Sequence, residues 1–125
     1  MSYIDGFILP LKDASLEEYT RLAETFATKA RANGAIGSLE AIGDGLEHGH
    51  TTDFFRAVQA EDGENVVFSF VVWPDKATRD AGWEKIMADP DMQPGAQPMP
   101  FDSKRMFWGG FKPFVSTFEP ATADA

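Results

Sequence analysis

Two segments of this chain, residues 66–73 and 106–118, are largely apolar at both their odd and their even positions. Successive side chains of a β-strand point to opposite faces of the sheet, so each segment would place apolar side chains on both faces. A strand of this kind has to be covered on both faces. The pattern therefore limits the chain to architectures in which something covers each side of a sheet.

The rest of the pattern predicts two helices and two further strands. A first strand is expected at residues 3–9, where Pro10 either ends it or places it near a sheet edge. A helix follows, from a capping box that begins at Ser15 to a stop at Asn33-Gly34. Its apolar residues recur every three or four positions, which is typical of an amphipathic helix.

A second, glycine-rich strand is expected at residues 35–42. The second helix is expected between Asp75 and Asp89, where a following proline stops it. Gly82 lies on the inner face of this helix and would let its axis approach the sheet. Residues 53–60 fit either a short helix or a strand.

The element order predicts a ferredoxin-like β-α-β-β-α-β sandwich, an α+β fold, in one domain at residues 1–119, with a flexible C-terminal tail at 120–125. Two helices can cover only one face of such a sheet. The other face would expose more apolar surface than monomers usually tolerate. We therefore expect a homodimer in which two sheets pack face to face as a dimeric α/β barrel.

The composition limits the classes of partner. The chain has 11 Lys and Arg against 20 Asp and Glu, a formal net charge of −9. A nucleic-acid binder normally carries a basic stripe, and acidity also disfavours an anionic membrane surface. No secretory leader or bilayer-length apolar run is visible. We expect a soluble, cytoplasmic protein with no nucleic-acid and no membrane partner.

Few residues in the sequence could hold a metal. There is no Cys, and the two histidines are His48 and His50. On an extended segment these two share a face, and Asp44, Glu47 or Asp53 could complete a ligand set. Two solvated loop histidines are the commoner situation, because metal sites usually need more convergent ligands. We predict no metal and no cofactor.

Seven short motifs spread along the chain form one pattern. They are Tyr3-Ile4-Asp5-Gly6-Phe7, Thr52-Asp53-Phe54, Val66-Val67-Phe68-Ser69-Phe70, Arg79-Asp80-Ala81, Met87-Ala88-Asp89-Pro90, Met99-Pro100-Phe101-Asp102-Ser103-Lys104-Arg105-Met106 and Gly109-Gly110-Phe111. Together they resemble the family known as domain of unknown function 1428, over nearly the whole chain. The resemblance implies the dimeric α/β barrel superfamily and no particular activity. That superfamily includes cofactor-free monooxygenases, haem enzymes, isomerases and ligand-sensing modules, and the fold alone does not choose among them.

Three functions of different classes stay open. The first is a homodimer that binds a small, partly apolar molecule in or beside the barrel. The alternative is a cofactor-independent enzyme, monooxygenase-like or isomerase-like, that uses Asp5, Asp53 or Asp102 as a carboxylate base. Burial would have to raise the pKa of such a base toward neutrality. The third is a structural dimer that binds a protein partner.

A ligand site is expected where the start of the first strand meets the turn before the last strand. Its candidate residues are Asp5, Asp102, Lys104, Arg105 and Trp108. Arg105 could hold a carboxylate ligand, or it could form a salt-bridged turn with Asp102. Asp5 could point inward, or it could pair with Arg105 or Lys104. The other possible register of the two strands would keep Asp5 and Arg105 apart.

Overall fold

The computed structural model describes residues 2–118, so the expected tail at 120–125 lies outside the described residues. In chain order the elements are β1 (Tyr3–Lys12), η1 (Asp13–Ser15), α1 (Leu16–Ala32), β2 (Gly37–Ile42), α2 (Phe54–Ala57), β3 (Glu64–Trp73), α3 (Lys76–Ala88), η2 (Pro90–Met92), η3 (Ser103–Arg105) and β4 (Phe107–Phe111). The predicted α+β class and β-α-β-β-α-β order are confirmed. None of the helices within residues 2–118 has the length and apolar character that crossing a bilayer requires.

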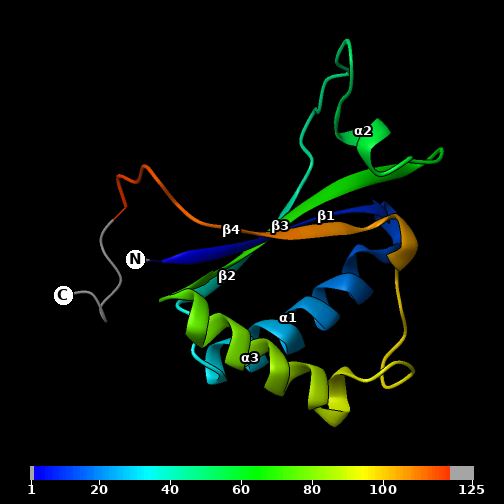
Figure 1. Ribbon diagram of the computed structural model, residues 1–125. Helices are drawn as coiled ribbons and strands as arrows, with labels where there is room; N and C mark the ends of the chain where they lie inside the picture. The colour runs from blue at the N-terminus through cyan, green and yellow to red at the C-terminus, as the bar shows by residue number, and fades with distance from the viewer. Residues whose placement is uncertain (1, 119–125) are drawn as a thin grey trace.

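Within the described residues the strands form one antiparallel sheet in the order β2-β3-β1-β4, the ferredoxin-like order. The central strands β1 and β3 pair along their whole length, from Tyr3 opposite Trp73 to Lys12 opposite Glu64. The main helices α1 and α3 lie on one side of this sheet. The connection between β2 and β3, residues 43–63, carries α2 and extends on the other side (Figure 1).

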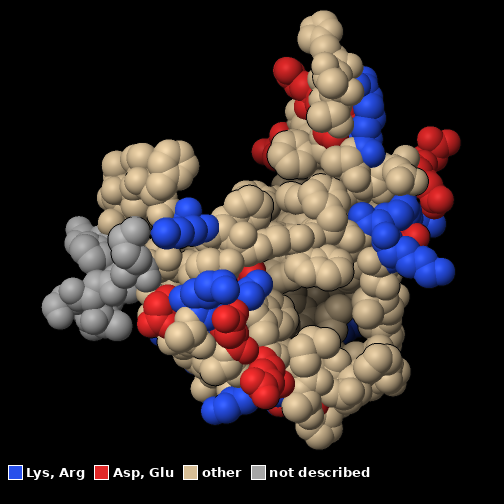
Figure 2. Space-filling view, in the orientation of Figure 1, with Lys and Arg blue, Asp and Glu red and all other residues tan. Residues whose placement is uncertain are grey.

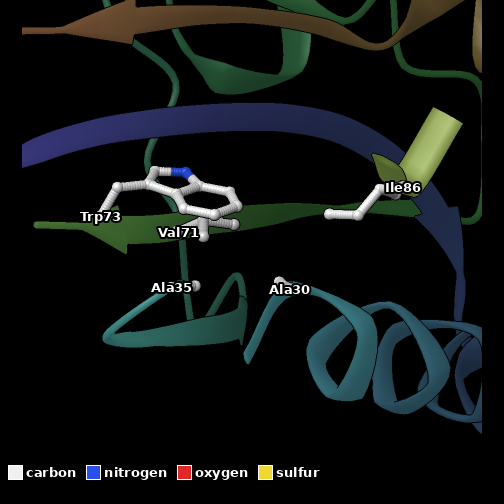
Figure 3. Close-up of a cluster of buried hydrophobic side chains, with 5 residues drawn as sticks. All are labelled: Ala30, Ala35, Val71, Trp73 and Ile86. Atoms are coloured by element: carbon white, nitrogen blue, oxygen red, sulfur yellow. The ribbon is translucent and has the colours of Figure 1, made fainter. Parts of the chain in front are cut away.

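The side chains between the sheet and the helices form the core. One buried cluster consists of Ala30, Ala35, Val71, Trp73 and Ile86 (Figure 3). Gly82 of α3 lies against the Trp73 ring, and a Cβ at this glycine would come within 2.6 Å of that ring. The absence of a side chain therefore lets α3 pack close to β3, as the sequence predicts.

The opposite side of the sheet, here called the open face, carries mostly apolar side chains, glycine and proline, with one charged pair, Lys12 and Glu64, at its end. Its other residues, assigned by the strand registers, are Ile4, Gly6, Ile8, Pro10, Gly37, Leu39, Ala41, Val66, Phe68, Phe70, Val72, Phe107, Gly109 and Phe111. Phe68 is 47%, Phe107 45% and Phe111 64% exposed. The predicted two-faced apolar pattern is thus present, and the main helices α1 and α3 cover one of the two faces, while on the open face Pro10 and Val66 are buried.

The last strand is shorter than the sequence pattern predicts. β4 ends at Phe111, whereas the apolar pattern predicts a strand over residues 106–118. Phe111 pairs with Ile4, and β1 begins only one residue earlier, so no strand remains for residues 112–118 to pair with. These residues run away from the sheet (Figure 1), and Phe114 is 95% and Phe118 88% exposed.

The predicted capping box at Ser15 is wrong. Its hydroxyl makes no cap hydrogen bond, because the chain enters α1 through the 3₁₀ turn η1. In that turn the N–H of Leu16 donates to the carbonyl of Asp13, so the backbone itself satisfies a first-turn donor. The other predicted caps are confirmed: Gly34 has a φ of +106° after α1, and Asp75 accepts from the N–H of Thr78 at 2.7 Å.

Two ambiguous positions are also settled. Pro10 lies inside β1 and does not end it. The pairing of β1 with β4 stops at Ile8, so Pro10 lies where β1 has become an edge strand, which is where a proline is tolerated. The ambiguous segment 53–60 forms the single helical turn α2, whose N-cap Asp53 accepts from the N–H of Arg56 at 2.8 Å.

Candidate functional site

The candidate site is a pocket on the helix side of the sheet, enclosed by α1, the sheet, Trp83 of α3 and residues 91–103. Its volume is about 430 Å³, a size that suits a small organic molecule. Aromatic rings of Phe7, Phe26, Trp83 and Phe101 form much of its wall. The surface is visibly hollowed between the sheet and α3, and largely uncharged residues border the hollow (Figure 2).

Three polar side chains meet on one wall of this pocket, and we call them the Tyr19–Glu40–Ser69 cluster. Glu40 of β2 accepts hydrogen bonds from the Tyr19 hydroxyl at 2.5 Å and from the Ser69 hydroxyl at 2.7 Å, one on each carboxylate oxygen. Tyr19 is 7% and Ser69 3% exposed. Burial, and secondly the hydrogen bond to Glu40, raise the pKa of Tyr19 far above its ordinary value. Tyr19 therefore keeps its proton and stays a donor.

The charge in this pocket is negative. Glu40 and Asp91 are its charged lining residues, and no Lys, Arg or His of the described chain lines it. Asp91 lies at the rim, where Lys29 pairs with it at 3.0 Å. Within residues 2–118 Glu40 makes no ion pair, and its partners are the two hydroxyls. The pocket thus combines apolar walls with one carboxylate that no cation neutralises.

Asp5 forms a separate buried cluster beside the pocket. Its carboxylate is 2% exposed and accepts from the indole N–H of Trp73 at 3.0 Å and of Trp83 at 2.8 Å. Arg79 of α3 donates to it through Nη2 at 2.7 Å and also through Nε. The hydrogen bond to Asp5 is the main cause that raises the pKa of Arg79. Asp5 points inward, which is one of the two predicted alternatives. Its partner is Arg79, and not Arg105 or Lys104 as the other alternative predicts.

The other predicted site residues lie toward the opposite end of β1. Asp5 is opposite Gly110, whereas Arg105 precedes Phe107, the partner of Ile8. The register that separates Asp5 from Arg105 is therefore the one that forms. The structure brings Asp102 and Arg105 together and leaves Asp5 apart from them.

Arg105 forms a salt-bridged turn. It donates to Glu64 at 2.6 and 2.9 Å and to Asp102 at 3.0 Å. These hydrogen bonds are the main cause that lowers the pKa of Glu64 and of Asp102. Lys104 and Trp108 are exposed, and neither lines the pocket between α1 and the sheet. That these residues bind a ligand stays a prediction, while their observed contacts join β3 to the turn before β4.

Asp53, which follows the loop that carries His48 and His50, is the N-cap of α2. Asp53 accepts from the N–H groups of Arg56 and Gly49, and these bonds, that of Arg56 first, lower its pKa. The His48 ring stacks on Phe55 at 4.8 Å and lies 3.5 Å from Asp53. In the part of the chain that the structure describes, no three His, Cys, Asp or Glu side chains are grouped as metal ligands.

The Tyr19–Glu40–Ser69 cluster is not among the sites predicted from the sequence. A signal was present, because Ser69 is the one polar residue of segment 66–73 and Glu40 the one charged residue of segment 35–42. The register pairs these two residues directly and puts both on the helix side of the sheet. An isolated polar residue within an apolar strand marks such a site.

Comparison with known proteins places the chain among relatives without an assigned activity. A family model described as "Protein of unknown function (DUF1428)" matches residues 2–103. The chain is 38% identical over 115 residues to the uncharacterized protein YbaA of Escherichia coli strain K12. The matched region covers 92% of this chain and 98% of the relative. The proteins of the same name from Escherichia coli O157:H7 and Shigella flexneri match to the same extent.

Proposed function

We propose a function for this chain, which belongs to the DUF1428 family: it forms a homodimer in which each copy binds a small, partly apolar molecule in the pocket between α1 and the sheet. The observation that carries the proposal is the pocket of about 430 Å³, with aromatic walls and the Tyr19–Glu40–Ser69 cluster on one side. Apolar walls with a few convergent polar groups are the usual form of a small-molecule site.

The polar cluster supports a binding role because burying its hydroxyls lowers the stability of the fold. The hydroxyls of Tyr19 and Ser69 are buried and lose hydration, which their hydrogen bonds to Glu40 restore only in part. Apolar residues at these two buried positions would pack without this loss. The cluster thus serves a purpose that packing does not require, and orienting a bound molecule is such a purpose.

The open face supports the homodimer. Its aromatic side chains, such as Phe68 and Phe111, form an apolar surface of a kind that monomers seldom leave in water. Apart from Lys12 and Glu64 at one end, the registers place no charged residue on this face, although the chain has a net charge of −9. Charge repulsion between two copies should therefore be weaker over this face than over the rest of the surface.

Packing two open faces would give the dimeric α/β barrel that the family resemblance implies. The interface should bury at least about 1,600 Å² in total, the area of a standard complex. The pocket lies on the opposite side of the sheet, so it would stay beside the barrel and remain accessible in the dimer. Dimerisation and ligand binding are thus compatible.

The alternative activity, an enzyme with a carboxylate base, would depend on Glu40. Asp5 has its oxygens occupied by N–H donors, and hydrogen bonds lower the pKa of Asp53 and Asp102, which makes them weak bases. Of the two carboxylates that line the pocket, Glu40 is the one without an ion pair within residues 2–118, and it would be the base of a cofactor-independent isomerase-like or monooxygenase-like reaction.

A ligand screen by thermal shift tests the pocket, with an Ala23→Phe variant to block it. Ala23 lines the pocket from α1, so a phenyl ring there should fill part of it. Ala81→Phe makes the same change on the exposed surface of α3 and serves as the control. Compounds that bind in the pocket should raise the melting temperature of the unmodified chain and of Ala81→Phe, but not of Ala23→Phe. The proposal fails if every stabilising compound acts equally on all three chains, or if none stabilises.

A further inference from the structure

We infer that the pocket selects a ligand whose polar end is a cationic amine, held by Glu40, over a ligand of the same shape that ends in a carboxylate. This inference rests on the proposed function of the pocket as a small-molecule site. It concerns the chemical class of the ligand, which the volume and apolar walls alone do not decide.

The direction of the hydrogen bonds in the cluster is the first argument. Tyr19 and Ser69 each have one hydroxyl proton, and both protons are donated to Glu40, at 2.5 and 2.7 Å. With both hydroxyls donating to Glu40, the cluster offers a ligand oxygen lone pairs. An ammonium group has N–H donors and no acceptor, so it matches these lone pairs, whereas a carboxylate would have to take a hydroxyl proton away from Glu40.

The charge balance of the pocket is the second argument. Lys29 lies 3.0 Å from Asp91 and 3.0 Å from Asp89, while Glu40 makes no ion pair within residues 2–118. Glu40 lines the pocket and is exposed, so water reaches its carboxylate. A ligand that fills the pocket displaces that water, and the carboxylate then needs a counter-charge. A cationic ligand supplies one, and an anionic ligand adds repulsion.

The aromatic wall is the third argument. The Trp83 ring lies 5.3 Å from the Phe26 ring and 6.0 Å from the Phe7 ring. Such rings provide apolar area for the body of a ligand, and their faces attract cations. The same wall would give no comparable attraction to a carboxylate. An amine with an aromatic or alkyl body thus fits each part of the pocket.

Three indole compounds of matched shape test this inference by isothermal titration calorimetry at pH 7. Tryptamine ends in an ammonium group, indole-3-propionate in a carboxylate and tryptophol in a hydroxyl. Tryptamine should bind at least about tenfold more tightly than indole-3-propionate, since charge-assisted hydrogen bonds are the strong ones. The Ala23→Phe variant should bind all three compounds more weakly, which assigns the binding to the pocket.

Glu40→Gln keeps the shape of the side chain and removes its charge. In this variant tryptamine should lose about tenfold in affinity, while tryptophol should change less than about threefold. Glu24→Gln makes the same change at an exposed position of α1 that does not line the pocket, and it should leave all three affinities unchanged.

Equal affinities for the three compounds, or tighter binding of indole-3-propionate, would overturn this inference and leave the proposed binding site standing. Tryptamine binding that Ala23→Phe does not weaken would also overturn it, because the cation would then bind elsewhere on an acidic protein. If none of the three compounds binds at millimolar concentration, the inference fails, and the proposed site fails with it for ligands of this size. The order of the three affinities in the unmodified chain tests the preference for a cationic ligand even if Glu40→Gln is unstable.

Discussion

At the scale of single residues, Asp5 connects three elements, β1, β3 and α3. It lies on β1 and accepts from Trp73 at the end of β3 and from Trp83 and Arg79 of α3. A buried carboxylate is tolerated only when charged and polar donors surround it, as they do here. The alternation of strand β1 could predict that Asp5 points inward. It could not predict Arg79, because that contact depends on how α3 packs across the sheet.

Asp5→Asn should destabilise the fold by about 3 kcal/mol or more, because the new amide N–H would face N–H donors and Arg79 would lose its buried partner. Urea unfolding measures this change. Asp80→Asn is the control: Asp80 pairs with the same Arg79 at 2.9 Å but lies at the surface, so its loss should change the free energy of unfolding by less than about 1 kcal/mol. Similar losses in the two variants would contradict the structural role of Asp5.

At the scale of elements, Arg105 holds the turn η3 against the start of β3. Its partner Glu64 has a side chain that is 5% exposed, and the guanidinium contacts both carboxylate oxygens. Such a bidentate ion pair fixes the direction in which the chain enters β4. Stability at this junction should therefore depend on the charge of Glu64.

The pH dependence of unfolding tests this junction. Arg105 lowers the pKa of Glu64 below its ordinary value of 4.5. A carboxyl group whose pKa is lower in the folded state contributes stability above its unfolded pKa and loses it as the pH falls through the folded pKa. From pH 4.5 downward, the free energy of unfolding should therefore fall more steeply in the unmodified chain than in Glu64→Gln.

Glu61→Gln is the matched control for this measurement. Glu61 lies 3.8 Å from the same Arg105, but its side chain is 70% exposed. Its removal should leave the pH dependence close to that of the unmodified chain. Equal slopes for the unmodified chain and Glu64→Gln below pH 4.5 would show that the pair adds no pH-dependent stability.

The elements that could be predicted from the sequence are those with local causes. The N-cap at Asp75 and the left-handed Gly34 need only neighbouring residues, and both are found where the sequence puts them. The end of β4 at Phe111 could not be predicted, because it is set by where the distant strand β1 begins. The pairing of Glu40 with Ser69 likewise depends on the β2–β3 register. Long-range pairing thus fixes both the strand length and the polar cluster.

At the scale of the whole molecule, the open face should determine the assembly state. In a two-fold interface each substituted residue occurs twice, so one added charge is doubled. Phe68 lies on the central strand β3 and is 47% exposed on this face. Met87 of α3 is 66% exposed and lies away from the sheet, which makes it the matched control position.

Sedimentation at micromolar concentration should give the mass of two chains for the unmodified protein and for Met87→Glu. Phe68→Glu should sediment as a monomer, because burying two unpaired carboxylates should raise the dissociation constant by at least about a hundredfold. A folded monomer of the unmodified chain at this concentration would refute the homodimer.

The position of β1 has a consequence for how the protein is made. Among the strands of residues 2–118, β1 is synthesised before the others and its neighbour β4 after them, and Ile4 pairs with Phe111. Closing so long a loop is entropically unfavourable, and contacts between distant residues slow folding. One edge of β1 therefore stays unpaired until β4 has been synthesised. During that interval the nascent chain is most vulnerable to aggregation and most dependent on chaperones.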